Sequence, residues 1–142
     1  MDRVIEFAVN NLLLTAAFII VVSAIITNEI MTFRKGRFAI DTTDATRLFN
    51  RDQAVFIDIR NENAYQKSHL PGAINIPLEH VDKRKDKLQR FSGQTMIVYC
   101  DTGSTTLKAV KALQAQGWDK VHQLRGGINA WRAAGLPIDG RK

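Results

Sequence analysis

The chain has 142 residues, a formal net charge of +6 at pH 7 and a single cysteine, Cys100. One cysteine excludes an intrachain disulfide and a CxxC metal knuckle, as is typical of proteins in a reducing compartment. After an apolar amino-terminal stretch, about a hundred residues remain, which is enough for one compact domain and too few for two. Neither a metal site nor a cofactor is expected.

The first predicted element is an uncharged, largely aliphatic helix over residues 7–28. As a helix this stretch would span about 33 Å, against a bilayer hydrocarbon core of about 30 Å. We predict a membrane anchor over residues 1–28, followed by a basic linker over residues 29–37. A cleaved secretory signal is the main alternative, because Val22–Ala24 offers small residues for cleavage. A water-soluble amphipathic helix is a third interpretation, although polar residues do not recur at a helical period in this stretch.

The charges that flank this helix predict its orientation. On the amino side, Arg3 is offset by Asp2 and Glu6. The basic residues that follow the apolar run are Arg34, Lys35, Arg37 and Arg47. The positive-inside rule therefore keeps the carboxyl side in the cytoplasm, and the same distribution favours an uncleaved anchor over a signal peptide.

Short apolar runs alternate with helical patterns over residues 38–139, which we assign to one domain, with residues 140–142 as a tail. The predicted strands cover 38–41, 54–59, 73–76, 96–99 and 120–124. The predicted helices cover 42–50, 62–68, 79–90, 104–116 and 127–134. This alternation predicts an α/β fold, a five-stranded parallel sheet covered by helices on both faces. Ligands of such sheets bind at the carboxyl ends of the strands.

The helix predicted over residues 79–90 is densely basic. Its cations, interrupted by Asp82 and Asp86, are Lys83, Arg84, Lys85, Lys87 and Arg90. Most such faces are simply solvated, but close to a membrane this one could also contact anionic lipid headgroups, an acidic partner protein or RNA. We therefore expect the lipid bilayer as a partner, keep a membrane protein as a further one, and do not expect nucleic acid.

Cys100 ends the predicted strand 96–99 and precedes a loop of small residues that opens a helix. Backbone N–H groups converge at such a helix start, and the helix dipole favours negative charge there. A thiol in this position ionises more easily, and the thiolate is its reactive form. Cys100 is thus a candidate nucleophile. Its position alone is equally compatible with a buried, inert cysteine.

The loop that follows Cys100 is the candidate anion-binding site. Its residues are Asp101, Thr102, Gly103, Ser104 and Thr105. Their amides can converge on the sulfur, and Gly103 can adopt a conformation that other residues resist. The hydroxyls add possible donors, although we expect Ser104 or Thr105 to cap the helix instead.

Several motifs, in order and spacing, resemble the rhodanese homology domain. They are residues 55–60 (VFIDIR), Tyr65, residues 69–77 (HLPGAINIP), residues 97–100 (IVYC) and residues 124–131 (LRGGINAW). The resemblance extends over nearly all of residues 38–139. Together with the predicted anchor, the chain resembles single-domain, membrane-tethered bacterial rhodaneses, which implies the inner membrane with the domain on its cytoplasmic side.

The resemblance implies a sulfurtransferase in which Cys100 accepts sulfane sulfur as a persulfide and passes it to a thiophilic acceptor. The expected partner is a small sulfur donor or a persulfide-carrying protein. The remaining family landmarks are interpreted as structural: Asp58 and Arg60 pair with each other or with nearby backbone, and His69 fixes the turn that contains Gly72. Trp118 and Trp131 are expected to be packing anchors.

Two departures narrow the chemistry. Related dual-specificity phosphatases clamp phosphate with an arginine six residues after the cysteine, where this chain has Thr106, so phosphatase activity is not expected. Thiosulfate-using family members commonly carry basic residues in the loop, whereas this chain has Asp101 and Thr105. A carboxylate there opposes a dianionic donor and raises the pKa of the cysteine, against the effect of the helix dipole. Thiosulfate is therefore a doubtful donor.

Two other functions are compatible with the same residues. A rhodanese fold at a membrane could serve as a scaffold that recruits other proteins. An accessible thiolate could also act as a redox sensor through sulfenic acid or a mixed disulfide. We favour sulfur transfer because the whole loop around Cys100 is present, and replacing Cys100 alone distinguishes an enzyme from a scaffold. Arg125 is a further residue that could contact substrate, although a surface role is preferred.

Overall fold

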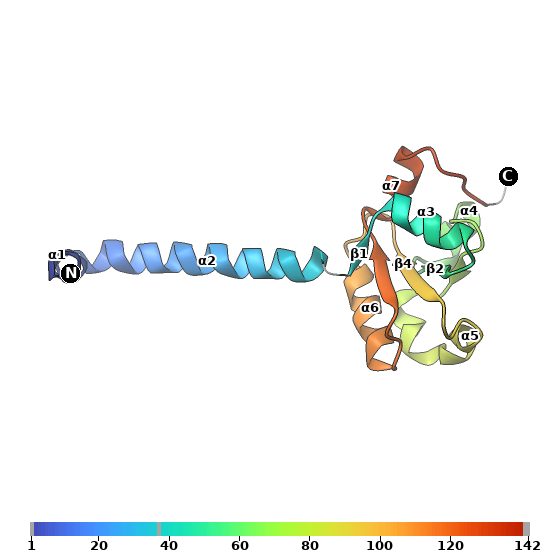
Figure 1. Cartoon of the computed structure of the whole chain (residues 1–142), viewed down its shortest axis with the longest axis horizontal. Coiled ribbons are helices and arrows are strands. Elements are labelled where there is room, and N and C mark those ends of the chain that lie inside the picture. Colours follow the sequence, from blue (N-terminus) through green and yellow to red (C-terminus); the bar gives the residue numbers. More distant parts are fainter. Residues whose placement is uncertain (1, 37, 141–142) are drawn as a thin grey trace. The chain divides into compact units, whose positions relative to one another are not determined.

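The computed structural model describes residues 2–36 and 38–140, and the chain divides into two compact units, residues 1–37 and 38–142 (Figure 1). The first unit contains α1 (Asp2–Asn10) and α2 (Leu12–Gly36). Within α2, Leu12–Ile30 is long and apolar enough to cross a membrane, and its large apolar side chains are exposed. This unit therefore contains a helix that could be a membrane span.

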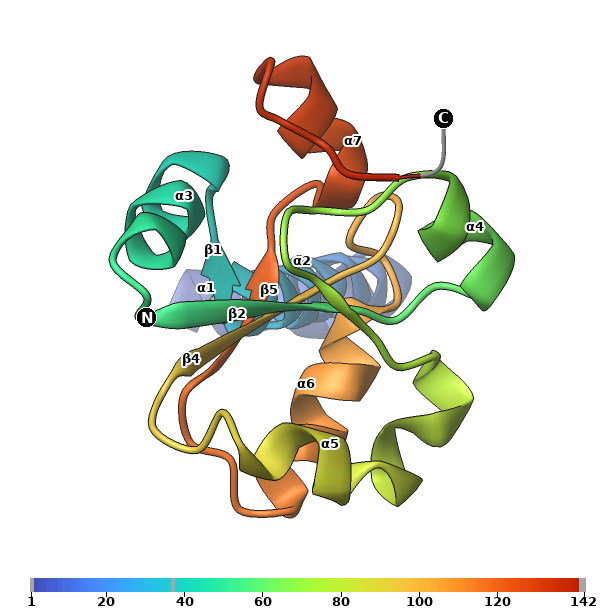
Figure 2. The ribbon, with the colours of Figure 1, turned by 90° about the vertical axis from the view of Figure 1, so that its right-hand side faces the viewer.

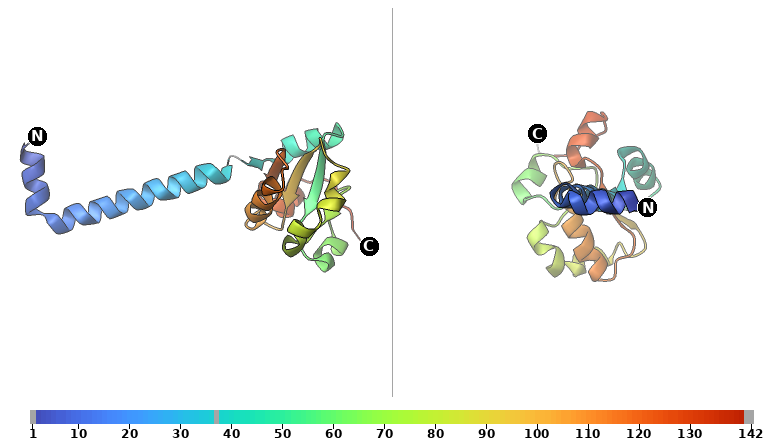
Figure 3. Two further views of the ribbon diagram at one scale, coloured as in Figure 1. Left: turned by 90° about the horizontal axis from the view of Figure 1, so that it is seen from below. Right: turned by 90° about the vertical axis from the view of Figure 1, so that its left-hand side faces the viewer.

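The prediction of one continuous helix over residues 7–28 is wrong at Asn11. The chain bends there between α1 and α2, as Figure 3 shows. The side-chain amide of Asn11 donates to the Phe7 carbonyl oxygen over 3.0 Å. The main-chain N–H of Asn11 donates to the same oxygen over 3.0 Å, so Asn11 closes the last turn of α1 with both groups. At its other end α2 runs beyond residue 28, and residues 29–36 of the predicted basic linker are helical.

The second unit is built on one sheet. Its strands are β1 (Ala39–Ile40), β2 (Ala54–Asp58), β3 (Ile74–Asn75), β4 (Thr95–Tyr99) and β5 (Val121–Leu124). They lie in the order β1-β5-β4-β2-β3, and every pairing is parallel. The five-stranded parallel sheet predicted from the sequence is thus confirmed for the described residues. The two central strands, β2 and β4, are longest and buried, as expected of a sheet covered on both faces.

Helices cover both faces of this sheet (Figure 2). They are α3 (Thr42–Asn50), α4 (Glu62–Lys67), the 3-10 helix η1 (Leu78–Lys83), α5 (Lys85–Gln89), α6 (Thr106–Ala115) and α7 (Gly127–Ala133). One core lies beneath η1, α5 and α6, where Val81, Leu88 and Val110 are buried. The other lies beneath α3 and α7, where Ala45 and Trp131 are buried. Each core exists because alternate residues of β2 and β4 point to opposite faces.

The basic helix predicted over residues 79–90 is wrong as a single element. It divides into η1 and α5 at Arg84, whose φ of −114° and ψ of 33° are not helical. Only Val81 and Leu88 are buried in η1 and α5. A continuous helix needs an apolar face at every turn, and this segment places charged residues between its two buried positions.

Candidate active site

Cys100 immediately follows β4, at the carboxyl edge of the sheet. Its side chain belongs to the core beneath α6, beside Ile59 and Ile76, and the residue is 7% exposed. The neighbouring strand continues in register, since the Ile59 N–H donates to the Tyr99 carbonyl oxygen over 3.1 Å. The site therefore lies where the sheet topology places ligand sites in this class of fold.

The loop surrounds the sulfur with hydrogen-bond donors. The N–H of Gly103 lies 3.0 Å from Sγ of Cys100. The amides of Thr102 and Thr105 and the hydroxyl of Thr105 also favour the anionic form of the sulfur. Burial alone would raise the pKa of the thiol, but these donors stabilise the anion more strongly, so the pKa of Cys100 is lowered. The loop donors thus outweigh the effect of burial on the pKa of Cys100.

The structure assigns the loop hydroxyls differently from the sequence prediction. Thr105 is the N-cap residue of α6 but makes no side-chain capping bond, and its hydroxyl faces the sulfur instead. Ser104 accepts a hydrogen bond from the Thr102 hydroxyl. The hydroxyl of buried Thr106 lies 2.7 Å from the Gly103 carbonyl oxygen and 2.9 Å from Oε1 of Gln123. The expected cap by Ser104 or Thr105 is therefore absent, because these hydroxyls have partners within the loop.

Gly103 is required by the loop conformation. Its φ is +86°, a region that residues with a side chain rarely adopt. A Cβ there would also lie 3.4 Å from the carbonyl oxygen of Leu124. This confirms the expectation that Gly103 supplies an unusual backbone conformation, and it explains how its N–H turns back toward the sulfur.

The start of α7 holds the Cys100 loop from the other side. The N–H groups of Ile128 and Asn129 donate to the carbonyl oxygens of Cys100 and Asp101, over 2.9 and 3.1 Å. Gly127 has a φ of +60°, and a Cβ at this position would lie 2.6 Å from the Asp101 carbonyl oxygen. Sequence analysis missed this role of Gly127. The adjacent glycines Gly126 and Gly127 after a strand were the available signal.

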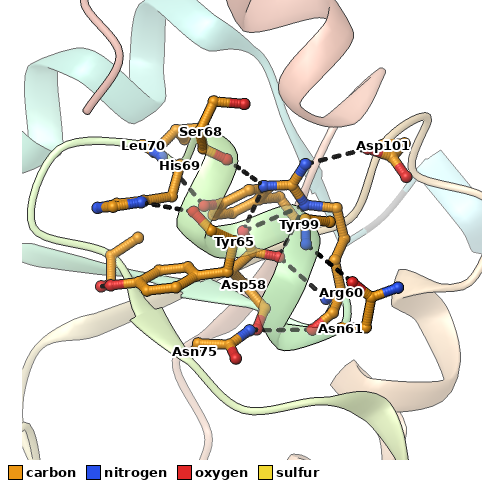
Figure 4. A network of polar contacts seen from close by, with 12 residues as sticks. Asp58, Arg60, Asn61, Tyr65, Ser68, His69, Leu70, Asn75, Tyr99 and Asp101 are labelled. Carbon is orange, nitrogen blue, oxygen red and sulfur yellow. Dashed lines mark hydrogen bonds and ion pairs between the residues drawn. The ribbon is translucent and has the colours of Figure 1, made fainter. Parts of the chain in front are cut away.

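Asp58 and Arg60 form a buried ion pair at the end of β2 (Figure 4). The Arg60 guanidinium donates to both carboxylate oxygens of Asp58, with Nη2 2.6 Å from Oδ2. It also donates to the Ser68 carbonyl oxygen over 2.6 Å and to the Asp101 carboxylate over 3.1 Å. Burial opposes the charge, but the carboxylates outweigh it and raise the pKa of Arg60. Arg60 thus joins three segments of the chain, and one of them is the Cys100 loop.

Comparison with known proteins agrees with this geometry, since residues 41–134 match the model of the rhodanese-like domain. The chain belongs to the rhodanese-like domain family. YibN, an uncharacterized protein of Escherichia coli, is 26% identical over 139 residues, and the match covers 97% of each chain. A sulfurtransferase of Allochromatium vinosum is 30% identical over 92 residues, which is 65% of this chain and 84% of that one. The crystal structure of a full-length protein from Lactobacillus plantarum is similar with a TM-score of 0.69 at 27% identity, and the match covers 81% of this chain and 97% of that one.

The remaining landmarks of the rhodanese-like domain stabilise the segment after α4. Nδ1 of His69 lies 2.8 Å from the Tyr65 carbonyl oxygen, and the two rings stack at 4.0 Å. The main chain of His69 pairs with Asp139. Leu70 donates to the Tyr99 hydroxyl, which burial and the nearby Asp58 hold protonated by raising its pKa. Gly72 has a φ of +65° in the turn that follows. These residues position the backbone that receives Arg60.

Two further predicted residues are packing anchors, and a third lies on the surface. Trp131 is buried, and its indole N–H donates to the Pro137 carbonyl oxygen over 2.8 Å. Trp118 packs at the edge of the core beneath α6. Arg125 is exposed, and its main-chain N–H donates to the Ile40 carbonyl oxygen. Within residues 2–36 and 38–140, no three His, Cys, Asp or Glu side chains gather in a way that could hold a metal ion.

Proposed function

We propose that this protein is a sulfurtransferase that carries sulfane sulfur as a persulfide on Cys100. The observation that supports the proposal is the set of donors around Sγ, from the amides of Thr102, Gly103 and Thr105 and the hydroxyl of Thr105, which lower the pKa of Cys100. Membership in the rhodanese-like family and the presence of sulfurtransferases among its relatives support it further.

The reaction proceeds in two displacements. The Cys100 thiolate attacks the outer sulfur of a persulfide donor, the donor's S–S bond breaks, and the donor leaves as a thiolate. The acceptor thiolate or cyanide then attacks the outer sulfur on Cys100, and that S–S bond breaks to restore the Cys100 thiolate. Each step forms one bond to sulfur and breaks one, so no external oxidant or reductant is consumed.

The donor is a persulfide on a small thiol or on a partner protein, in preference to thiosulfate. The Asp101 carboxylate is 64% exposed at the rim of the loop, where it repels a dianion. Its partner Arg60 is already bonded to Asp58 and is largely buried, so it offers little free positive charge to thiosulfate. The Asp101 charge affects only the choice of donor, and Cys100 acts in the same way with either donor.

The proposed location is the bacterial inner membrane, with α2 as a single-pass anchor in the lipid bilayer and the domain in the cytoplasm. The apolar stretch Leu12–Ile30 supports this proposal. Protease treatment of spheroplasts tests it. A full-length protein whose rhodanese-like domain is digested only after lysis is expected, whereas a shortened mature form would indicate a cleaved signal.

The sulfur-transfer proposal is tested by intact-mass analysis of the detergent-solubilised full chain after exposure to persulfides or thiosulfate. A mass gain of one sulfur that is removed by cyanide, and that is absent from the Cys100→Ala variant, is expected. If folded protein gains no sulfur from any donor, the proposal fails, and a membrane-tethered binding module becomes the better interpretation.

A further inference from the structure

A hollow apart from the Cys100 loop lies at the β3 edge of the sheet, between α4 and the η1–α5 segment. It encloses about 320 Å³. Its lining includes Glu62, Tyr65, Asn75, His80, Arg84 and Lys87. Figure 4 shows Tyr65 and Asn75 beside the Asp58–Arg60 network. A space of this size accommodates a ligand such as an amino acid or a short peptide.

The charges of this hollow favour a ligand with carboxylates. Arg84 and Lys87 both line it, together with His80, and all three are exposed. Neither Arg84 nor Lys87 takes part in an ion pair in the described part of the chain. Glu62 supplies one carboxylate on the α4 side. Two cationic groups opposite one anionic group complement a zwitterion that carries an excess of carboxylates.

The η1–α5 segment supplies both cations of the hollow. Arg84 occupies the non-helical position, and Lys87 lies within α5. Lys83 and Lys85, which flank Arg84 in the sequence, are absent from the lining. The segment thus places Arg84 and Lys87 at the hollow and Lys83 and Lys85 on other surfaces.

One wall of the hollow borders the core in which the sulfur lies, and Tyr65 on its other wall packs against the opposite core. Ile76 lines the hollow, and Ile76 and Cys100 belong to the same core cluster. The strand β2 separates β3 from β4, and Ile76 donates to the Asp58 carbonyl oxygen over 2.9 Å while Ile59 donates to that of Tyr99. Two strand spacings place Ile76 about 10 Å from Cys100. An extended tripeptide spans a similar distance of about 10 Å.

We propose that this hollow binds the carboxylates of a small peptidyl thiol, whose persulfide is the sulfur donor for Cys100. The inference rests on the proposed sulfurtransferase function and specifies its substrate class. The thiol sulfur lies at the Cys100 loop, and the peptide extends across the end of β2 so that its carboxylates contact Arg84 and Lys87. Glu62 then faces the ligand's ammonium group.

The test compares two donors on the full chain in detergent. Glutathione persulfide carries two carboxylates and one ammonium, and the persulfide of 2-mercaptoethanol carries none. In the double variant Arg84→Ala/Lys87→Ala we expect the KM for glutathione persulfide to rise about tenfold. Tenfold corresponds to about 1.4 kcal/mol, which is within what two exposed charge contacts contribute together. The KM for the neutral persulfide should be unchanged. Lys83→Ala/Lys85→Ala removes the same charge outside the hollow and should change neither KM.

The outcomes separate this inference from the function on which it rests. Three results would overturn it while sulfur transfer stands. The KM could rise equally for both donors, it could rise equally in both double variants, or it could stay unchanged in all of them. If no donor loads Cys100, the proposed function fails. Binding of unreactive S-methylglutathione to the Cys100→Ser protein then decides the question: weaker binding after Arg84→Ala/Lys87→Ala supports the hollow as a peptide site, and unchanged or absent binding rejects it.

Discussion

The segments that follow β2 and β4 stabilise negative charge at the same edge of the sheet in different ways. At the end of β2, the Asp58 carboxylate is paired with the Arg60 guanidinium and is fully buried. After β4, the Cys100 sulfur receives the Gly103 amide, and the groups that lower its pKa are the loop amides and the Thr105 hydroxyl. One anion is neutralised by a full charge and the other is stabilised by neutral dipoles.

This difference matches the use that each anion can have. The Asp58 carboxylate fixes the Arg60 guanidinium in one geometry through bidentate bonds. Arg60 can therefore join β2, the loop at Ser68 and the loop at Asp101. A thiolate stabilised by amide and hydroxyl dipoles is held where it lies and remains a nucleophile. The same dipoles can stabilise a persulfide anion after transfer.

The largest expected effect comes from breaking the charged pair. Arg60→Ala leaves the buried Asp58 carboxylate without its cation, and such a loss costs about 3–5 kcal/mol in the free energy of unfolding. Arg47→Ala is the matched control, because Arg47 pairs with Asp44 on the surface and should cost less than about 1 kcal/mol. Chemical denaturation of the full chain in detergent, followed by tryptophan fluorescence, measures both. Equal losses would contradict the structural role of the buried pair.

A smaller but still large effect is expected where α7 meets the Cys100 loop. Gly127→Ala combines an unfavourable φ with a clash against main-chain oxygens of the loop. We expect it to lower the free energy of unfolding by more than about 2 kcal/mol and to reduce sulfur loading on Cys100. Gly135→Ala is the control: its φ of +68° is similar, but nothing lies within 4 Å of the added Cβ. A similar loss of stability in both variants would show that strain in φ, and not contact with the loop, sets the cost.

The sequence was sufficient for the sheet and for the position of Cys100, because both depend on local patterns. Buried apolar runs that alternate with helices determine a parallel sheet, and a cysteine at the end of one run must lie at its carboxyl edge. The division of residues 79–90 into η1 and α5 was missed. The segment is rich in charged residues typical of a solvated helix, and its small number of apolar positions was the signal against one continuous helix.

Contacts between distant segments were beyond local patterns. The bond from Arg60 to Asp101 joins residues 41 positions apart. It depends on β2 lying next to β4, which strand order alone decides. The orientation of the Thr105 hydroxyl was missed for a related reason, because a threonine at a helix start is usually its cap and only the folded loop shows that the sulfur is the better acceptor.

A moderate effect is expected from removing one dipole. Thr105→Val deletes the hydroxyl that donates to the sulfur, so the thiolate is less stabilised and the pKa of Cys100 rises. The midpoint of the pH dependence of iodoacetamide alkylation should move upward by about 0.5 to 1 pH unit, since hydrogen bonds to charged groups contribute about 1.5 kcal/mol when partly exposed. Ser104→Ala removes a hydroxyl that is bonded to Thr102 instead and should leave the midpoint in place. A shift of the same size in the control would reject the specific role of Thr105.

The smallest expected effect lies where the two regions meet, at the Asp101 carboxylate. Asp101→Asn removes one negative charge from the rim and keeps an oxygen that can accept from Arg60. Because Arg60 already offsets this charge in part and the side chain is largely exposed, thiosulfate kcat/KM should rise only about three- to fivefold, and less at high ionic strength. Loading by a neutral persulfide should not change. A gain of a hundredfold would show that Asp101 acts on the donor as an unscreened charge, contrary to its pairing with Arg60. If the native protein used thiosulfate as efficiently as the best persulfide, Asp101 would have no role in the choice of donor.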